Sequence, residues 1–274
     1  QGATRHSLLI NLGGGMVTDL GGFAAATFKR GISYINIPTT LLAMVDASVG
    51  GKTGINFNGL KNEIGAFAPA NSVLIETEFL RTLDAYNFFS GYAEMLKHGL
   101  ISNTAHWVEL LNFNTSNIDY TALKQLVGQS VQVKEDIVEQ DPFEHGIRKA
   151  LNLGHTVGHA FESMALAEDR PVLHGYAVAW GIVCELYLSH LKVDFPKEKM
   201  RQTIQFIKDN YGVFTFDCKK YDQLYAFMTH DKKNTSGTIN FTLLKDIGDI
   251  CINQTADKDT IFEMLDFYRE CMGI

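Results

Sequence analysis

Several features of an exported or membrane protein are missing from this sequence. No stretch stays apolar over the roughly 18 residues that a membrane-spanning helix needs, and the first residues lack the pattern of a secretory signal peptide. Cysteine is scarce, and none of the four cysteines stands in a CxxC spacing. We therefore expect reduced thiols rather than disulfides or a zinc finger. Together these absences predict a cytoplasmic protein without a membrane partner.

Long runs of like charge are missing as well. The net charge is −7, whereas general nucleic-acid binding needs a clustered basic surface, so we exclude nucleic acid as a partner. A few lysines and arginines still suffice to bind a small anionic substrate. The remaining composition, 46% hydrophobic and 20% charged over 274 residues, is that of a globular protein. This length can bury a proper core in one large domain or two moderate ones.

The first 84 residues alternate between strand and helix patterns. Short apolar runs predict strands at 7–12, 33–37 and 72–76, and such runs are typical of a buried parallel sheet. The first run ends at Gly13-Gly14-Gly15, and a strand, a glycine turn and a helix start together can bind a pyrophosphate. The spacing is not the full GxGxxG fingerprint, so a tight turn that requires positive φ explains these glycines equally well.

A second glycine pair precedes Lys52. The segment Gly50-Gly51-Lys52-Thr53 resembles the end of a phosphate-binding P-loop, but Asp46 stands where the first glycine of that motif belongs. The P-loop is therefore excluded. We expect instead a loop in which Lys52 contacts an anion, with Lys61 and Asn62 as additional donors.

Helical patterns dominate after about residue 85. We predict helices at 88–102, 104–113, 117–140, 155–167, 174–192, 196–211, 219–229 and 256–271. Only 238–244 and 249–253 look like strands, in a hairpin around Gly248. The sequence thus predicts an α/β domain with a parallel sheet at 1–84 and a mainly α-helical domain at 85–274. A cleft between two such domains is the usual place for a ligand.

Histidines gather in the predicted helical domain. His155 and His159 are four residues apart, so on a helix they share a face and can reach one point above it. With His174 beyond a short loop and Glu94 upstream, they can form a catalytic divalent-metal site with an open coordination position. A lone histidine on an apolar helix is more often a hydrogen-bonded core residue, but glycines beside all three favour the metal site. Thr156 replaces the glutamate of the HExxH motif, which argues against a peptidase.

Glu94 has an alternative explanation. It lies three residues before Lys97, on the same helical face, and such pairs are usually ion pairs on the surface. Its neighbours Tyr92, Met95 and Leu96 are apolar. We therefore expect a partly buried carboxylate.

Several longer motifs resemble the 3-dehydroquinate synthase family, in the right order and over nearly the whole chain. They are Gly13 to Phe23, Pro38 to Asp46, Gly50-Gly51-Lys52-Thr53, Lys61-Asn62, Glu94-Met95-Leu96-Lys97, Arg148, Asn152-Leu153-Gly154-His155, His159, Leu173-His174-Gly175 and Asp231-Lys232-Lys233. Because many long motifs occur together in the same order, their combination is far more specific to the family than any single motif.

The resemblance implies an enzyme that uses NAD and a divalent metal ion, Zn²⁺ or Co²⁺. Members of the family are lyases of the shikimate pathway of aromatic amino acid biosynthesis. They convert the seven-carbon sugar acid phosphate DAHP into 3-dehydroquinate and phosphate by transient oxidation, phosphate elimination, reduction and aldol closure. On this resemblance Glu94, His155 and His174 are the metal ligands, and His159 belongs to the substrate pocket. The helical spacing alone permits either arrangement of the two histidines.

The other matching positions divide between substrate and cofactor. The resemblance assigns the phosphate group to Lys52, Asn62, Asn152, His159 and one of Lys232 or Lys233. It assigns Arg30 to the phosphate of the neighbouring subunit, which implies a homodimer, Lys97 and Arg148 to the substrate carboxylate and hydroxyls, and Asp46 to cofactor and substrate. It assigns NAD to Gly13, Gly14, Gly15, Asp19, Thr39, Thr40, Lys52, Lys61, Phe79, Leu80, Arg81 and Thr82.

Two departures from the family pattern stand out. Tyr176 occupies a position that holds glutamate in many members, which predicts altered hydrogen bonding around the metal ligands. Family members also carry a nucleotide-binding segment before the position of Ser7. We therefore expect this chain to lack its natural beginning and part of the NAD-binding domain.

Three alternatives to this function remain open at this stage. One is another sugar-phosphate cyclase, such as a 2-epi-5-epi-valiolone synthase, although the phosphate- and carboxylate-contacting residues keep the dehydroquinate-synthase type. A metal-dependent polyol dehydrogenase shares the architecture but needs no residues that bind phosphate. The third is a catalytically silent fragment that binds a metal or a partner subunit.

Overall fold

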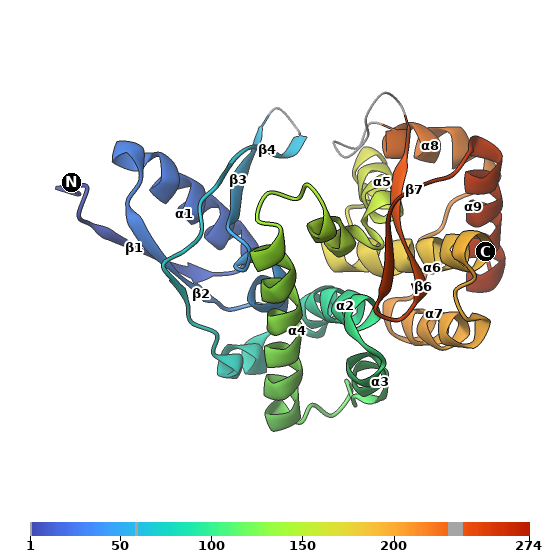
Figure 1. Cartoon of the computed structure of the whole chain (residues 1–274), viewed down its shortest axis with the longest axis horizontal. Coiled ribbons are helices and arrows are strands. Elements are labelled where there is room, and N and C mark those ends of the chain that lie inside the picture. The colour runs from blue at the N-terminus through green and yellow to red at the C-terminus, as the bar shows by residue number, and fades with distance from the viewer. Residues whose placement is uncertain (1, 58–59, 230–237) are drawn as a thin grey trace. The chain divides into compact units, whose positions relative to one another are not determined.

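The computed structural model describes residues 2–57, 60–229 and 238–274, without the side chains of 60–62. It divides into two compact units (Figure 1). Unit 1 comprises Gln1–Met95 and Asn114–Phe143, and unit 2 comprises Leu96–Phe113 and Glu144–Ile274. The chain thus returns to unit 1 after residue 113. The domains expected from the sequence, 1–84 and 85–274, stay a prediction.

A small parallel sheet organises unit 1, as the sequence predicts. Strands β1 (Leu8–Gly13), β2 (Ser33–Pro38) and β5 (Ser72–Val73) lie in the order β1-β2-β5. Helix α1 (Gly15–Thr27) connects β1 to β2 and packs on both (Figure 1). The third strand is shorter than the predicted 72–76. The Glu76 carboxylate accepts a hydrogen bond from the Glu78 N–H and starts the 3₁₀ helix η3 (Thr77–Thr82), which ends the extended segment.

The prediction of a loop around Lys52 is wrong in part, because Lys52 lies in a strand. Lys52 begins strand β3 (Lys52–Phe57), which pairs antiparallel with β4 (Leu60–Phe67) in a hairpin. Gly54 and Gly65 face each other in this pairing, and a Cβ on Gly65 would lie 2.3 Å from the Thr53 carbonyl oxygen. Glycines and charged residues interrupt the apolar residues of both strands, so no regular alternation predicts this hairpin.

The helices lie within three residues of the predicted ends. They are α2 (Ala85–Ser102), α3 (Thr104–Asn112), α4 (Tyr120–Gln140), α5 (His155–Ala167), α6 (His174–Val193), α7 (Lys197–Tyr211), α8 (Tyr221–Thr229) and α9 (Lys258–Met272). Side chains of Asn103, Asp119 and Asp257 accept backbone hydrogen bonds at the starts of α3, α4 and α9. Among the described residues, no helix is both long and apolar enough to cross a lipid bilayer.

Helix α6 forms the core of unit 2. It packs against α5, α7, α9 and strand β6 (Asn240–Asp246), which pairs with β7 (Asp249–Thr255) in the hairpin predicted around Gly248 (Figure 1). An aromatic cluster of Phe161, Trp180, Phe214 and Tyr268 joins α5, α6 and α9. Because α6 is buried along most of its length, the polar groups on it are held in fixed surroundings.

The four cysteines are free thiols, and their burial predicts an order of reactivity. Complete burial raises the pKa of Cys184, and burial raises the pKa of Cys271 to about 11, while Cys218 is exposed. Only the thiolate reacts with an alkylating agent. With iodoacetamide at pH 8, peptide mass spectrometry should find Cys218 modified first and Cys184 protected until the chain is unfolded. Equal alkylation of Cys184 and Cys218 in the folded chain would contradict the packing of α6.

Candidate functional site

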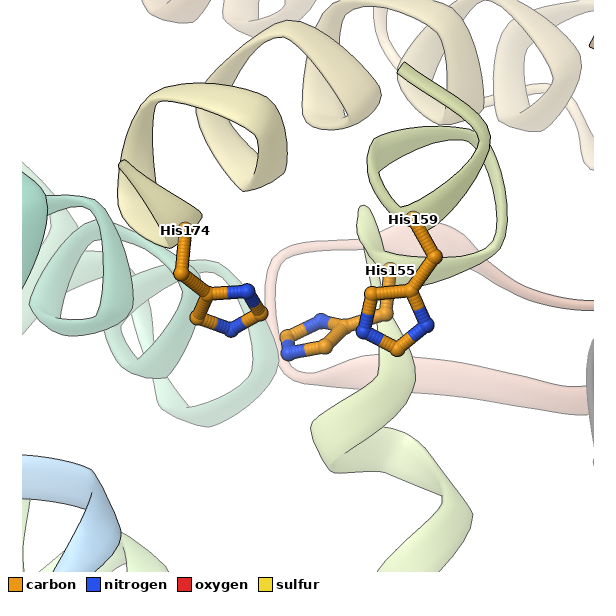
Figure 2. A group of neighbouring side chains, drawn as sticks. All are labelled: His155, His159 and His174. Carbon is orange, nitrogen blue, oxygen red and sulfur yellow. The ribbon is translucent and has the colours of Figure 1, made fainter. Parts of the chain in front are cut away.

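Three histidines come together in unit 2. His155 is the first residue of α5, His159 follows one turn later, and His174 is the first residue of α6. Their ligand nitrogens lie within 4.8 Å of one another, and the ring centroids are 5.3 to 5.8 Å apart. Figure 2 shows the three rings pointing toward a common space from two helices. The structure thus places together the three histidines that the sequence singles out.

Hydrogen bonds orient two of the rings. The Nδ1 atom of His155 lies 3.1 Å from the Leu153 carbonyl oxygen, and that of His174 lies 3.3 Å from Glu162 Oε2. A carbonyl or carboxylate oxygen accepts, so each Nδ1 carries the hydrogen. The lone pair on Nε2 is then available to a metal ion, and this is the usual arrangement of metal-binding histidines.

Glycines let the two histidine-bearing helices approach closely. A Cβ on Gly158 of α5 would lie 2.8 Å from the Ala177 carbonyl oxygen, and a Cβ on Gly181 of α6 would lie 2.0 Å from that of Gly154. Gly154 itself adopts φ +79° immediately before α5, a conformation that favours glycine. These glycines therefore let the start of α5 contact the first two turns of α6.

Asp46, Glu94 and Lys134 form a cluster of charged groups in unit 1, and Lys97 follows Glu94 on α2 in unit 2. Carboxylate oxygens of Asp46 and Glu94 lie within 4.8 Å of each other. Glu94 and Lys97 are both buried, at 0% and 1% exposure, so the alternative of an ion pair on the surface is wrong. The Lys134 ammonium donates to Asp46 twice, at 2.6 Å to Oδ1 and 2.5 Å to the carbonyl oxygen. The buried Lys134 therefore balances the charge of Asp46.

The glycine turn meets the end of strand β2. Gly13 ends β1, Gly14 caps α1, and the Thr39 N–H donates to the Gly13 carbonyl at 2.9 Å. A Cβ on Gly14 would lie 3.2 Å from the Thr40 side chain. The carboxyl ends of β1 and β2 and the N-terminus of α1 thus come together, and this is the geometry that binds a dinucleotide pyrophosphate.

The remaining cofactor candidates lie in varied surroundings. Burial and the negative charge of Asp19 on α1 raise the pKa of Tyr34 to about 12. Within η3, Phe79 is 38% exposed, whereas Leu80 is buried. Arg81 pairs with Glu78 at 2.5 Å and lies over the Tyr120 ring.

The other substrate candidates are split between buried and exposed positions. Arg148 is buried in the 3₁₀ helix before α5, and the Asn152 amide donates to Glu144 Oε1 at 2.8 Å. Lys52 and Arg30 are exposed. The side chains of Lys61 and Asn62, and residues Lys232 and Lys233, lie outside the described residues.

Comparisons with known proteins decide the family. The family model described as 3-dehydroquinate synthase N-terminal matches residues 1–90, and the one described as 3-dehydroquinate synthase C-terminal matches 91–234. The chain is 63% identical over 274 residues to the 3-dehydroquinate synthase of Parabacteroides distasonis, covering all of this chain and 78% of that protein. This chain belongs to the 3-dehydroquinate synthase family.

Other relatives agree with this assignment. The 3-dehydroquinate synthase of Oceanobacillus iheyensis is 43% identical over 99% of this chain and 75% of its own length. Among solved structures, 2-epi-5-epi-valiolone synthase from Streptomyces hygroscopicus, with NAD⁺ and Zn²⁺ bound, has a TM-score of 0.85 at 27% identity and covers 98% of this chain and 75% of that one. The predicted α/β sheet followed by helices is thus confirmed as the dehydroquinate synthase-like fold.

Two residues at the candidate site, Lys134 and Glu162, are not predicted from the sequence. Lys134 lies on the buried face of α4, together with Val127, Ser130 and Ile137. A lysine at such a position is a sequence signal of a charged group with a role in the interior. Glu162 lies three residues after His159 on α5, so helical spacing alone places it near the histidines.

Tyr176, which departs from the family pattern, is buried in the core of unit 2. Its ring packs against Trp180 and Tyr211, with centroids 6.0 and 5.2 Å away, so the substitution adds to the aromatic packing of unit 2. The predicted change in hydrogen bonding around the metal ligands stays a prediction. Among the described residues, His174 instead has Glu162 beside its Nδ1.

Proposed function

We propose that this member of the family is a 3-dehydroquinate synthase that converts DAHP into 3-dehydroquinate and phosphate. The observation that carries the proposal is the 63% identity to the Parabacteroides distasonis enzyme along the whole chain. The gathering of His155, His159 and His174 supports it, because the reaction needs a metal ion beside an alcohol that is temporarily oxidised.

The residues present fit a divalent metal ion. We assign Glu94, His155 and His174 as ligands, which leaves one coordination position for substrate, as in catalytic zinc sites. The hydrogen bonds at Nδ1 of His155 and His174 support this choice, and His159 would then face the substrate. A relative in fold binds NAD⁺ and Zn²⁺. When bound here, the metal would polarise the substrate alcohol and NAD would supply the temporary oxidation.

The cationic residues suit an anionic substrate. Lys97 and Arg148 are buried at 1% and 2% exposure, and a buried cation interacts strongly with a carboxylate that reaches it. We assign them to the substrate carboxylate and hydroxyls, and the phosphate to Lys52, Asn62, Asn152, His159 and one of Lys232 or Lys233. The Asp46–Lys134 pair would hold the acidic group in one orientation toward cofactor and substrate.

The glycine turn at Gly13, Gly14 and Gly15 and the neighbouring threonines Thr39 and Thr40 would hold the NAD pyrophosphate, with Asp19, Lys61 and the Phe79–Thr82 segment as further contacts. We further propose a cytoplasmic homodimer of the shikimate pathway in which Arg30 reaches the phosphate in the neighbouring subunit. Arg30 is exposed at the end of a short 3₁₀ helix, and this exposure supports a contact with a neighbouring subunit.

Phosphate release from DAHP, with NAD and zinc supplied, tests this function. Steady release without net NADH formation is expected, because the oxidation is reversed within each turnover. A preference for sedoheptulose 7-phosphate would identify another sugar-phosphate cyclase, and accumulating NADH would identify a polyol dehydrogenase. A folded chain of the correct mass without turnover would be the silent fragment.

The proposed phosphate contact of Lys52 gives a binding prediction. Loss of a hydrogen bond to a charged group costs about 1.5–3 kcal/mol, so Lys52→Ala should weaken binding of a carbaphosphonate substrate analogue by roughly 10–100-fold. Isothermal titration calorimetry measures the change. Lys29→Ala, which removes a lysine beside Phe28, serves as the control, and equal affinities of both variants would exclude Lys52 from the phosphate site.

A further inference from the structure

Glu185 is an acidic residue inside the otherwise apolar middle of α6. It is completely buried, and its carboxylate accepts three backbone hydrogen bonds from the start of α5. The donors are the N–H groups of Gly154 at 2.7 Å, Thr156 at 3.0 Å and Val157 at 3.2 Å. A buried carboxylate is costly unless it is fully hydrogen-bonded, so this one defines the position of the segment that it binds.

These bonds replace a missing helix cap. Helices usually begin with a side chain that accepts from the second or third N–H of the first turn, but Gly154 at the cap position of α5 has no side chain. Glu185 takes that role from the neighbouring helix, and its negative charge lies at the positive end of α5. Gly181, one turn earlier on α6, allows this approach, because a Cβ there would lie 2.0 Å from the Gly154 carbonyl oxygen.

One peptide group links Glu185 to His155. The N–H of Gly154 and the carbonyl of Leu153 belong to the same planar peptide unit. Glu185 accepts from that N–H at 2.7 Å, and the carbonyl accepts from His155 Nδ1 at 3.1 Å. The peptide plane is therefore held from both sides, and hydrogen bonds in such a chain polarise one another.

We propose that Glu185 is a positioning residue for His155, acting through the Leu153–Gly154 peptide, so that the histidine is aimed at the metal before the metal binds. His174 receives a carboxylate directly, from Glu162 at 3.3 Å, whereas His155 receives one across a peptide bond. The inference rests on the proposed metal site and adds a second carboxylate that supports it.

Metal affinity of the purified chain tests the inference. Zinc is titrated in competition with a chromophoric chelator, and the visible spectrum of the cobalt-substituted chain reports ligand geometry. Outer partners of metal ligands typically contribute about 10–100-fold to affinity, so Glu185→Gln should bind zinc at least ten-fold more weakly and shift the cobalt bands. Glu162→Gln should give a loss of similar size.

The control separates positioning from general stability. Leu265→Ala removes a completely buried side chain of α9, so it should lower the melting temperature while leaving zinc affinity and the cobalt spectrum unchanged. If Glu185→Gln keeps the parent's zinc affinity and cobalt spectrum, the inference is wrong.

Amide hydrogen exchange of the metal-free parent gives an independent answer, even where Glu185→Gln does not fold. The N–H groups of Gly154, Thr156 and Val157 should be protected before zinc is added. Rapid exchange that slows only with zinc would show that the metal, and not Glu185, orders this turn, and would overturn the inference. A parent chain that binds no zinc but protects these amides would refute the proposed metal site while leaving Glu185 as the anchor of α5.

Discussion

His155→Ala should lose the metal ion and turnover together, whereas His159→Ala should keep the metal and turn over less efficiently. His155 is held by the Leu153 carbonyl in the orientation of a metal ligand, and removal of a ligand should cost more than the roughly 10–100-fold loss of affinity typical of an outer partner. His159 is assigned to the substrate phosphate, so its loss should lower kcat/KM by about 10–100-fold.

Metal content by mass spectrometry, measured beside phosphate release from DAHP, distinguishes the two histidines. The exposed His6 provides a matched control, since His6→Ala removes an imidazole far from both helix starts in the sequence. Because all three ring nitrogens lie within 4.8 Å, the opposite result is physically possible. Metal loss in His159→Ala with metal retained in His155→Ala would exchange their roles.

Lys134→Met should destabilise unit 1 and also impair catalysis. The Lys134 side chain is 9% exposed, and its ammonium makes two short hydrogen bonds to Asp46. Breaking a buried ion pair by removing one partner costs about 3 kcal/mol or more. The Asp46 side chain is 26% exposed, so we expect the lower end, about 3 kcal/mol of unfolding free energy. Turnover should fall because Asp46 loses its fixed orientation.

A second substitution separates the two effects. Adding Asp46→Asn to Lys134→Met removes the uncompensated charge, so urea unfolding should recover most of the lost free energy while phosphate release from DAHP stays low. Lys124→Met, an exposed lysine on the same helix, should change neither property. Parent-like stability of Lys134→Met would show that the ion pair with Asp46 contributes nothing.

Local patterns account for most elements of the fold. The helices follow from long apolar periods with capping residues such as Asn103 and Asp119, which act within a few residues of their position. The β3–β4 hairpin follows no such pattern, since its strands combine Gly54, Gly65 and charged residues. The pairing of β3 with β4 depends on which backbone segments come together in the folded chain. The residue composition of the two strands does not encode this.

The residues of the candidate site likewise divide into those that local sequence patterns predict and those that they do not. His155 and His159 share a helical face, so their spacing reveals them. His174 and Glu94 stand out by their residue type and surroundings, and the family motifs select Glu94, His155 and His174 as the expected ligands. Lys134 escaped because its partner Asp46 is 88 residues away.

The sequence by itself determined the family, the alternation of strands and helices, and the residue types needed for a metal ion, a dinucleotide and an anionic substrate. These properties depend on short-range spacing and on motifs that can be read in order. Only the tertiary structure decided that Glu185, 31 residues from Gly154, holds the start of the histidine-bearing helix. It also decided that Lys134 neutralises Asp46 and that Glu162 orients His174. A buried charge must find its partner wherever the packed chain brings one, and that choice is made by the packing of whole helices.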